Sequence, residues 1–169
     1  MGSGLRPHRE SLAIILYPAV CWAMVQDDET LAGMLRRNAG VRGGAPAILA
    51  GDVSVSHEAL AEAALRLAGG LAGLGLTPGQ RLAVYARKTP EAVTAFLAAA
   101  AAGGVFFPLD PNQPPGVTRA VLDRLAPAVL VVAAEYLPAL AALYPEGAPM
   151  PTVVCDGTAP AGKPALAEL

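Results

Sequence analysis

The segment from Ala101 to Pro115, AAGGVFFPLDPNQPP, constrains the fold more than any other part of the chain. Gly103 and Gly104 follow an alanine-rich helical pattern, and glycine readily adopts the left-handed backbone that ends a helix. Val105 to Phe107 then predict a short strand that is buried on both faces. Four prolines follow, the first at Pro108, and each lacks the backbone N–H that a sheet requires. The chain is therefore expected to leave the sheet at Pro108 and to open onto a loop.

The composition is apolar and carries no strong charge. Of the 169 residues, 54% are hydrophobic, which suggests that something covers part of the surface. The net charge is -2, from 12 basic and 14 acidic residues, so the chain offers no footprint for nucleic acid and no polybasic patch for a membrane. Cys21 and Cys155 have no metal-ligand spacing, and neither a metal site nor a disulfide framework is expected. A cytoplasmic location is expected.

Residues 1–28 form an N-terminal extension of unknown role. Its mostly apolar run from Ser11 to Val25 follows Arg6 and Arg9, as in a secretory signal peptide. The run is too short to span a bilayer, and it contains Pro18. A signal peptide, a helical or disordered extension, and a start codon assigned too early all remain open. No chemistry is expected in this segment.

From residue 29 the pattern predicts a helix, a hairpin and a second helix. The first helix can be capped by Thr30 and is expected to end near Gly40. Two short strands predict a hairpin that turns at Gly51 (residues 47–49 and 53–55). Ser56 can cap the second helix, whose apolar face repeats at helical spacing (Leu60, Ala64, Leu67, Leu71 and Leu74). Within this helix, Gly69, Gly70 and Gly73 predict close helix packing and no nucleotide-binding turn, because no strand precedes them.

After residue 78, strands alternate with helices. The apolar runs predict strands at residues 82–86, 105–107, 128–133 and 152–155. Strands that are apolar on both faces and are linked by helices indicate parallel β/α units. The predicted fold class is α/β, with mostly parallel β/α units preceded by a helix and a β-hairpin. Residues 157–169 are rich in proline, alanine and glycine and are expected to form a tail or linker.

Few residues suggest a ligand site. Asp110 follows a predicted strand at its carboxyl end, where open α/β sheets bind ligands; its alternative role is to cap the next loop through its side-chain oxygens. Arg87 and Lys88 take the equivalent position after the preceding strand, where they can meet a phosphate or lie in a solvated turn. His57 has Glu58 beside it but no third partner, so no catalytic role is expected. The residues predict no catalytic group and no metal site.

Three segments, in the correct order, resemble core motifs of the adenylate-forming superfamily, which includes acyl-CoA synthetases, luciferases and amino-acid adenylation domains. Val55 to Leu60 is similar to the motif L-[TS]-Y-x-E-L, with His57 and Ala59 where tyrosine and glutamate are usual. Pro78 to Val84 resembles the strand motif G-[DV]-x-V-[AG]-[IV]. Ala101 to Asp110 resembles the motif AGG-x-[FY]-x-P-[LI]-D, and its P-L-D-P sequence is closer to the amino-acid adenylation branch than to the acyl-CoA ligases.

The resemblance implies a partial N-terminal subdomain of the adenylate-forming fold over residues 29–156. In this family the complete enzyme uses ATP and Mg²⁺ to activate a carboxylic acid, which can be a fatty, aryl or amino acid. The acyl group then passes to CoA or to a carrier-protein thiol. The motifs matched here are mainly packing elements in the family.

The family's Ser/Thr/Gly-rich ATP loop, adenine-binding motif and C-terminal catalytic lysine have no counterpart in this sequence. The chain is therefore expected to be inactive alone, to bind no cofactor by itself and to need the remainder of the domain as its partner. It is expected to be an opening fragment, the product of an interrupted gene, or one piece of a split protein. The alternative is a non-catalytic α/β module with a binding or scaffolding role.

Overall fold

The computed structural model describes residues 30–144, 150–157 and 164–169, so the predicted extension of residues 1–28 lies outside the described part. The α-helices are α2 (Leu31–Arg42), α3 (His57–Gly73), α4 (Pro90–Ala101), α5 (Pro115–Leu125) and α6 (Leu137–Leu143). The strands are β1 (Pro46–Ala50), β2 (Val53–Ser56), β3 (Arg81–Tyr85), β4 (Val105–Leu109), β5 (Val129–Ala133) and β6 (Thr152–Asp156). Two short 3₁₀ helices complete the set, η1 (Ala134–Tyr136) and η2 (Leu166–Glu168).

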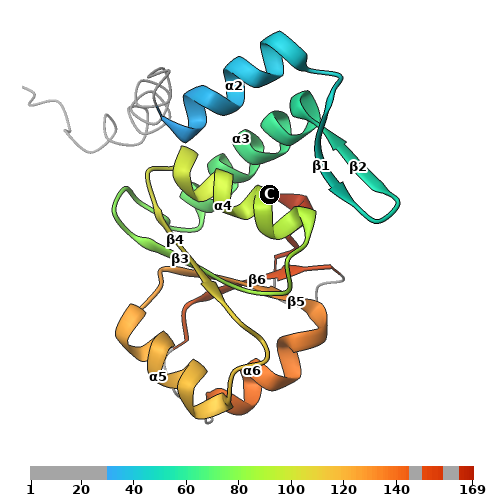
Figure 1. Ribbon diagram of the computed structural model, residues 1–169. Coiled ribbons are helices and arrows are strands. Elements are labelled where there is room, and N and C mark those ends of the chain that lie inside the picture. The colour runs from blue at the N-terminus through green and yellow to red at the C-terminus, as the bar shows by residue number, and fades with distance from the viewer. Residues whose placement is uncertain (1–29, 145–149, 158–163) are drawn as a thin grey trace, which may run out of the picture.

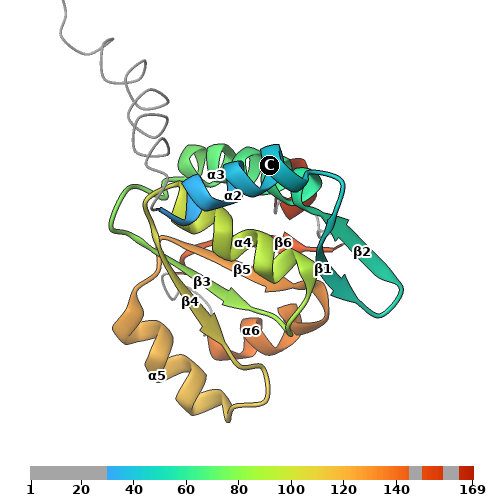
Figure 2. The ribbon, with the colours of Figure 1, turned by 45° about the horizontal axis from the view of Figure 1, so that its top comes forward.

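A four-stranded parallel sheet with the order β4-β3-β5-β6 lies between two layers of helices. Helices α2, α3 and α4 lie on one side of the sheet, and α5 and α6 lie on the other (Figure 1, Figure 2). Strands β1 and β2 form a separate antiparallel hairpin that turns at Gly51, whose φ is +59°. The predicted α/β class, with parallel units after a helix and a hairpin, is confirmed.

The two central strands bury both of their faces. Side chains alternate along β3, so that Leu82 and Val84 join the core under α3 and α4, whereas Ala83 and Tyr85 join the core over α5 and α6. Strand β5 alternates in the same way and is buried from Val129 to Val132. Parallel strands of this kind require helices on both sides, and the crossover connections supply them.

Side-chain caps fix where the first two helices begin. The hydroxyl of Thr30 accepts a hydrogen bond from the N–H of Gly33 at 3.0 Å, and the hydroxyl of Ser56 accepts one from the N–H of Ala59 at 3.2 Å. Both predicted caps are therefore confirmed. The first helix ends two residues beyond Gly40, near which its end was predicted: Gly40 keeps a helical backbone and α2 continues to Arg42.

The two glycines between α4 and β4 have different roles. Gly103 has a φ of +71°, the left-handed conformation that ends the helix, as predicted. Gly104 has no positive φ, but a Cβ on it would lie 3.2 Å from Cδ2 of Leu76 and 3.3 Å from the carbonyl oxygens of Ala99 and Gln80. Glycine fits at residue 104 because a Cβ there would be crowded by a core side chain and by two carbonyl groups.

Strand β4 is longer and less buried than the sequence predicts. It continues through Pro108 to Leu109, and Val105 and Phe107 are 50% and 37% exposed. Among the described strands it pairs only with β3, so it forms an edge of the sheet. The N–H of Val105 donates to the carbonyl oxygen of Gln80 at 2.7 Å. Alternate residues of a parallel strand bond to the same neighbour, so the nitrogen of Pro108 faces the open side and its missing N–H costs the sheet nothing.

The end of the predicted tail packs against the domain. Leu166 and Leu169 contact the core under α3 and α4, and a Cβ on Gly70 of α3 would lie 2.5 Å from Cβ of Leu169. Nothing lies within 4 Å of a Cβ placed on Gly69 or Gly73. The predicted close helix packing of the three glycines is therefore wrong: only Gly70 is closely approached, and by the C-terminal segment.

We expect Gly70→Ala and Gly69→Ala to change stability in opposite directions. Alanine at residue 69 meets no neighbour and should raise the free energy of unfolding by about 0.5–1 kcal/mol, because glycine inside a helix is entropically costly. Alanine at residue 70 collides with Leu169 and should leave the protein about 1–3 kcal/mol less stable than the Gly69→Ala variant. Urea unfolding measures both. In a chain that lacks residues 164–169 the collision is gone, and Gly70→Ala should then stabilise as Gly69→Ala does.

Thr118 of α5 offers a second test of the core. It is 1% exposed, and its hydroxyl has no hydrogen-bond partner among the described residues. A buried hydroxyl without a partner is destabilising, so Thr118→Val should raise the free energy of unfolding by about 1–3 kcal/mol. Valine and threonine have similar helix propensities. Thr118→Ser keeps the hydroxyl and loses the methyl group, and a gain in stability for this control would contradict the explanation.

Candidate functional site

The carboxyl ends of β3 and β5 form the position where an open α/β sheet can hold a ligand. From β3 the chain passes through α4 to β4 on one side, and from β5 it passes through α6 to β6 on the other. Adjacent strands whose connections diverge leave a crevice between their carboxyl ends. Arg87 and Lys88 follow β3 and are exposed at this edge, where the sequence predicts them.

Arg87 is paired across this edge. Its Nη2 lies 2.9 Å from Oε1 and 3.1 Å from Oε2 of Glu135 in η1, which directly follows β5. The rings of Tyr85 and Tyr136 pack together here with centroids 5.4 Å apart. Burial raises the pKa of Tyr136, a hydrogen bond to Glu135 adds to the rise, and the positive charge of Arg87 opposes it. An ion pair as exposed as this one contributes little to stability.

Glu135 and Tyr136 were not among the site residues predicted from the sequence. The signal was nevertheless present, because Glu135 follows the predicted strand 128–133 just as Arg87 follows the strand 82–86. Parallel strands share one carboxyl edge, so residues that follow neighbouring strands come close together. The order of the strands in the sheet, which the sequence does not show, was needed to place Glu135 beside Arg87 and Tyr136 beside Tyr85.

Asp110 caps a turn. Its Oδ1 accepts hydrogen bonds from the backbone N–H of Asn112 at 2.9 Å and from Nδ2 of Asn112 at 3.0 Å. Its carbonyl oxygen accepts a bond from the N–H of Gln113 at 3.1 Å. The structural alternative, a cap of the loop, is therefore confirmed. Within the described residues, no hydrogen bond or ion pair joins Asp110 to Arg87 or Lys88.

Two more carboxylates lie near this edge. Asp156 ends β6, and Glu91 lies in the first turn of α4. Burial raises the pKa of Asp156, and repulsion from Glu91 raises it further. Together with Glu135, these carboxylates outnumber the positive charges of Arg87 and Lys88. The described part of this edge therefore does not concentrate positive charge.

The start of α4, which lies at the described edge, has few free N–H donors for a phosphate. The N-terminus of α4 could offer N–H donors to an anion. However, Pro90 has no N–H, the N–H of Ala92 donates to Oγ1 of Thr89 at 3.2 Å, and the N–H of Val93 donates to the carbonyl oxygen of Thr89 at 3.2 Å. Few donors remain for a phosphate.

The described residues hold neither a group of metal ligands nor a membrane-spanning helix. Three or more His, Cys, Asp or Glu side chains nowhere gather in a way that could hold a metal ion. Within the same ranges, no helix is both long enough and apolar enough to cross a membrane.

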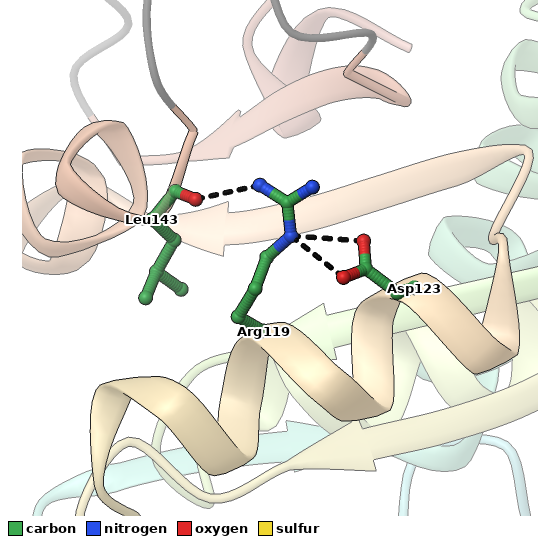
Figure 3. Close-up of polar contacts among 3 residues, drawn as sticks. All are labelled: Arg119, Asp123 and Leu143. Atoms are coloured by element: carbon green, nitrogen blue, oxygen red, sulfur yellow. Dashed lines mark hydrogen bonds and ion pairs between the residues drawn. The ribbon is translucent and has the colours of Figure 1, made fainter.

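Arg119 links α5 to α6 on the opposite side of the sheet (Figure 3). Its Nε donates to Oδ1 and Oδ2 of Asp123 at 2.8 and 2.9 Å, and its Nη1 donates to the carbonyl oxygen of Leu143 at 2.7 Å. Leu143 is the last residue of α6, where carbonyl groups lack a partner within the helix. The guanidinium also lies 4.6 Å from the ring centroid of Tyr144. This arrangement satisfies a helix end and holds two helices together, which is a structural role.

Comparison with known proteins gives the family. The model of the family "AMP-binding enzyme" matches residues 35–167. The chain belongs to this family of AMP-binding, adenylate-forming ligases. It is 38% identical to pyochelin synthetase PchE of Pseudomonas aeruginosa over 91 residues, which are 54% of this chain and 6% of that protein. It is 33% identical to novobiocin biosynthesis protein H of Streptomyces niveus over 130 residues, 77% of this chain and 21% of that protein.

A solved structure agrees with this assignment. Acetoacetyl-CoA synthetase from Streptomyces lividans superposes with a TM-score of 0.74 at 27% identity, over 82% of this chain and 24% of the synthetase. The predicted resemblance to the adenylate-forming fold is therefore confirmed. The chain spans less than a quarter of the length of each of these three proteins.

The raised pKa of Asp156 predicts a specific pH dependence. Its folded-state pKa lies above the ordinary value of 3.8, so the folded protein holds the proton more tightly than the unfolded chain does. The resulting stabilisation is fully present below the unfolded pKa and is lost as the pH rises through the folded pKa. Asp156→Asn should therefore be more stable than the wild type at pH 7, with the difference shrinking toward acid pH. Urea unfolding across this pH range measures the difference.

The matched control is Asp52→Asn, in the exposed turn of the hairpin. It removes one negative charge away from Asp156 and corrects for the general effect of net charge. An Asp156→Asn variant that is less stable than the wild type at pH 7 would contradict the expectation.

Proposed function

We propose that this chain is the N-terminal part of an AMP-forming ligase that activates a carboxylic acid as an acyl-adenylate with ATP. The observation that carries the proposal is the family match over residues 35–167, together with the parallel sheet and its two helical layers. The match covers packing elements, and the edge that follows them offers few donors to a phosphate. We therefore propose that the chain does not catalyse adenylation alone.

The proposed acid, cofactors and acyl acceptor follow from the family and from its members. The acid is a fatty, aryl or amino acid, ATP and Mg²⁺ serve the complete enzyme, and the acyl acceptor is CoA or a carrier-protein thiol. The name of the acetoacetyl-CoA synthetase supports CoA as the acceptor, whereas the carrier-protein thiol is proposed from the family alone. We place the activity in the cytoplasm, where ATP is available.

We propose only limited roles in ligand binding for Arg87, Lys88 and Asp110. Arg87 and Lys88 remain candidates for a contact with an anionic group, and for Arg87 such a contact competes with Glu135. For Asp110 we propose no cofactor contact, because its side chain is engaged in the turn. No residue of this chain is proposed as catalytic. The proposed limits of the partial domain are residues 29–156, with the segment after residue 163 packed against it.

One observation favours the second candidate, a non-catalytic binding or scaffolding module. The C-terminal segment packs onto α3, so the described residues form a closed core on that side. A module that works alone should unfold cooperatively as a monomer, whereas a part of a larger domain should aggregate or bind a hydrophobic dye.

The proposed function predicts the outcome of ATP–pyrophosphate exchange. The purified chain should show background exchange with any fatty, aryl or amino acid, since it lacks the ATP loop and the lysine. A chimera in which residues 30–169 replace the aligned segment of novobiocin biosynthesis protein H should retain exchange with that protein's own acid. A loss of up to about 100-fold is expected for a foreign but homologous packing segment.

Two controls frame this experiment: the intact parent protein and the parent with the aligned segment deleted. The deletion should abolish exchange. Robust exchange by the isolated chain, or a chimera that folds but is no more active than the deletion, would overturn the proposed function.

A further inference from the structure

Helix α2 is covered on one side only by the described residues. It packs against α3 and α4 and lies on the outer side of that helical layer (Figure 1). The side that faces these two helices buries Ala32, Gly33 and Leu35. The side that faces away from them therefore decides what else can contact α2.

An apolar stripe runs along the exposed side of α2. Leu31, Met34, Asn38 and Val41 follow the spacing i, i+3, i+7 and i+10, which places them on one face of the helix. Three of the four are apolar, and Leu31, Met34 and Val41 are 41%, 38% and 76% exposed. Such a stripe is typical of a helix face that packs against a further apolar segment. These four residues are called the α2 stripe below.

The chain that leads into α2 contains an apolar segment. Residues 11–25, SLAIILYPAVCWAMV, include no charged side chain. Polar residues 26–30 separate this segment from Leu31, and a connection of this length is usual between packed elements. The α2 stripe extends over about 15 Å, whereas residues 11–25 cover about 22 Å even in the compact rise of a helix. Pro18 would bend a helical form, but the segment is long enough to return along the whole stripe.

The backbone in front of α2 permits such a return. Thr30 is extended, with φ of -83° and ψ of 160°, and its hydroxyl caps the helix. The chain therefore leaves the helical path directly before Leu31. It can turn back along α2 within residues 26–30 and does not have to continue along the axis of the helix.

We propose that residues 11–25 dock on the α2 stripe and form an intramolecular cover of the domain. The tether decides the occupant, because a short connection gives the segment an effective concentration in the range of about 1 mM at the stripe. A second copy of the chain would have to approach that concentration to compete. The family match begins at residue 35, so this inference concerns the chain's own extension and does not depend on the proposed function. A segment held in this way is unavailable as a signal peptide or a membrane anchor.

The fluorescence of the full chain reports directly on the docked segment, because Trp22 is its only tryptophan. We expect the emission of Trp22 to be shifted to shorter wavelength relative to a peptide of residues 1–29. Acrylamide should quench Trp22 in the full chain at least about threefold less than in the peptide, because a docked indole is shielded from water.

Paired variants locate the docking surface. Met34→Gln/Val41→Gln makes the α2 stripe polar and keeps good helix formers, and it should raise the quenching of Trp22 at least about twofold above the wild type. The matched control, Leu49→Thr/Val53→Thr, removes two apolar side chains that are 75% and 52% exposed on the hairpin. It should be quenched like the wild type.

Cross-linking tests the same contact while the apolar residues of the α2 stripe stay in place. Asn38→Cys introduces a thiol in the middle of the stripe, and a short bis-maleimide should join it to the native Cys21 within one chain. Ser54→Cys, on the exposed hairpin, is the control and should give little of the corresponding product. Mass spectrometry of the digested monomer identifies the linked peptides. This measurement still decides the question if the stripe variant does not fold.

Four results would contradict the inference. They are quenching of Trp22 equal to that of the peptide, equal effects of the stripe and hairpin variants, and a thiol at residue 38 that links no better than the thiol at residue 54. The fourth is shielding of Trp22 that disappears on dilution, with links only between chains, which would identify a second copy as the occupant. Vesicles of phosphatidylcholine and phosphatidylglycerol should leave the emission of Trp22 unchanged, and a shift on their addition would favour a membrane-binding segment instead.

Discussion

Burial of β3 and β5 on both faces is the constraint on which the rest of the structure depends. Neither strand can face water, so each side of the sheet needs a layer of helices, and the crossovers of a parallel sheet supply those layers. Alanine-rich α4 packs closely on one side, and α5 and α6 cover the other. Because the connections of these two strands diverge, the same constraint creates the edge where Arg87 and Glu135 meet.

Structural and chemical roles are unevenly distributed among the polar residues of this chain. The polar groups that the described residues hold most firmly serve the fold: Asp110 caps a turn, and Arg119 satisfies the end of α6. At the carboxyl edge, where a ligand could bind, Arg87 is paired and the donors at the start of α4 are used locally. We therefore propose that the chain contributes a folded support and that the reacting groups come from elsewhere in the complete ligase.

Strand β4 contributes part of the apolar surface that the described residues leave exposed. Strand β4 has the apolar sequence of a buried strand, yet only one neighbour pairs with it among the described strands. Its Pro108 fits this position because the missing N–H falls on the open side. Exposure of Val105 and Phe107 is thus a property of where the strand lies, and an apolar sequence could not distinguish an edge strand from a central one.

The sequence by itself determined the local features and the family. Periodicity fixed the order of helices and strands, Thr30 and Ser56 marked helix starts, Gly103 marked a helix end, and motif order identified the adenylate-forming fold. Only the tertiary structure decided that β4 is an edge, that Arg87 meets Glu135 and that Leu169 packs on Gly70. Caps and periodicity act between residues a few positions apart, whereas those three contacts depend on which distant segments become neighbours, and local sequence does not record that.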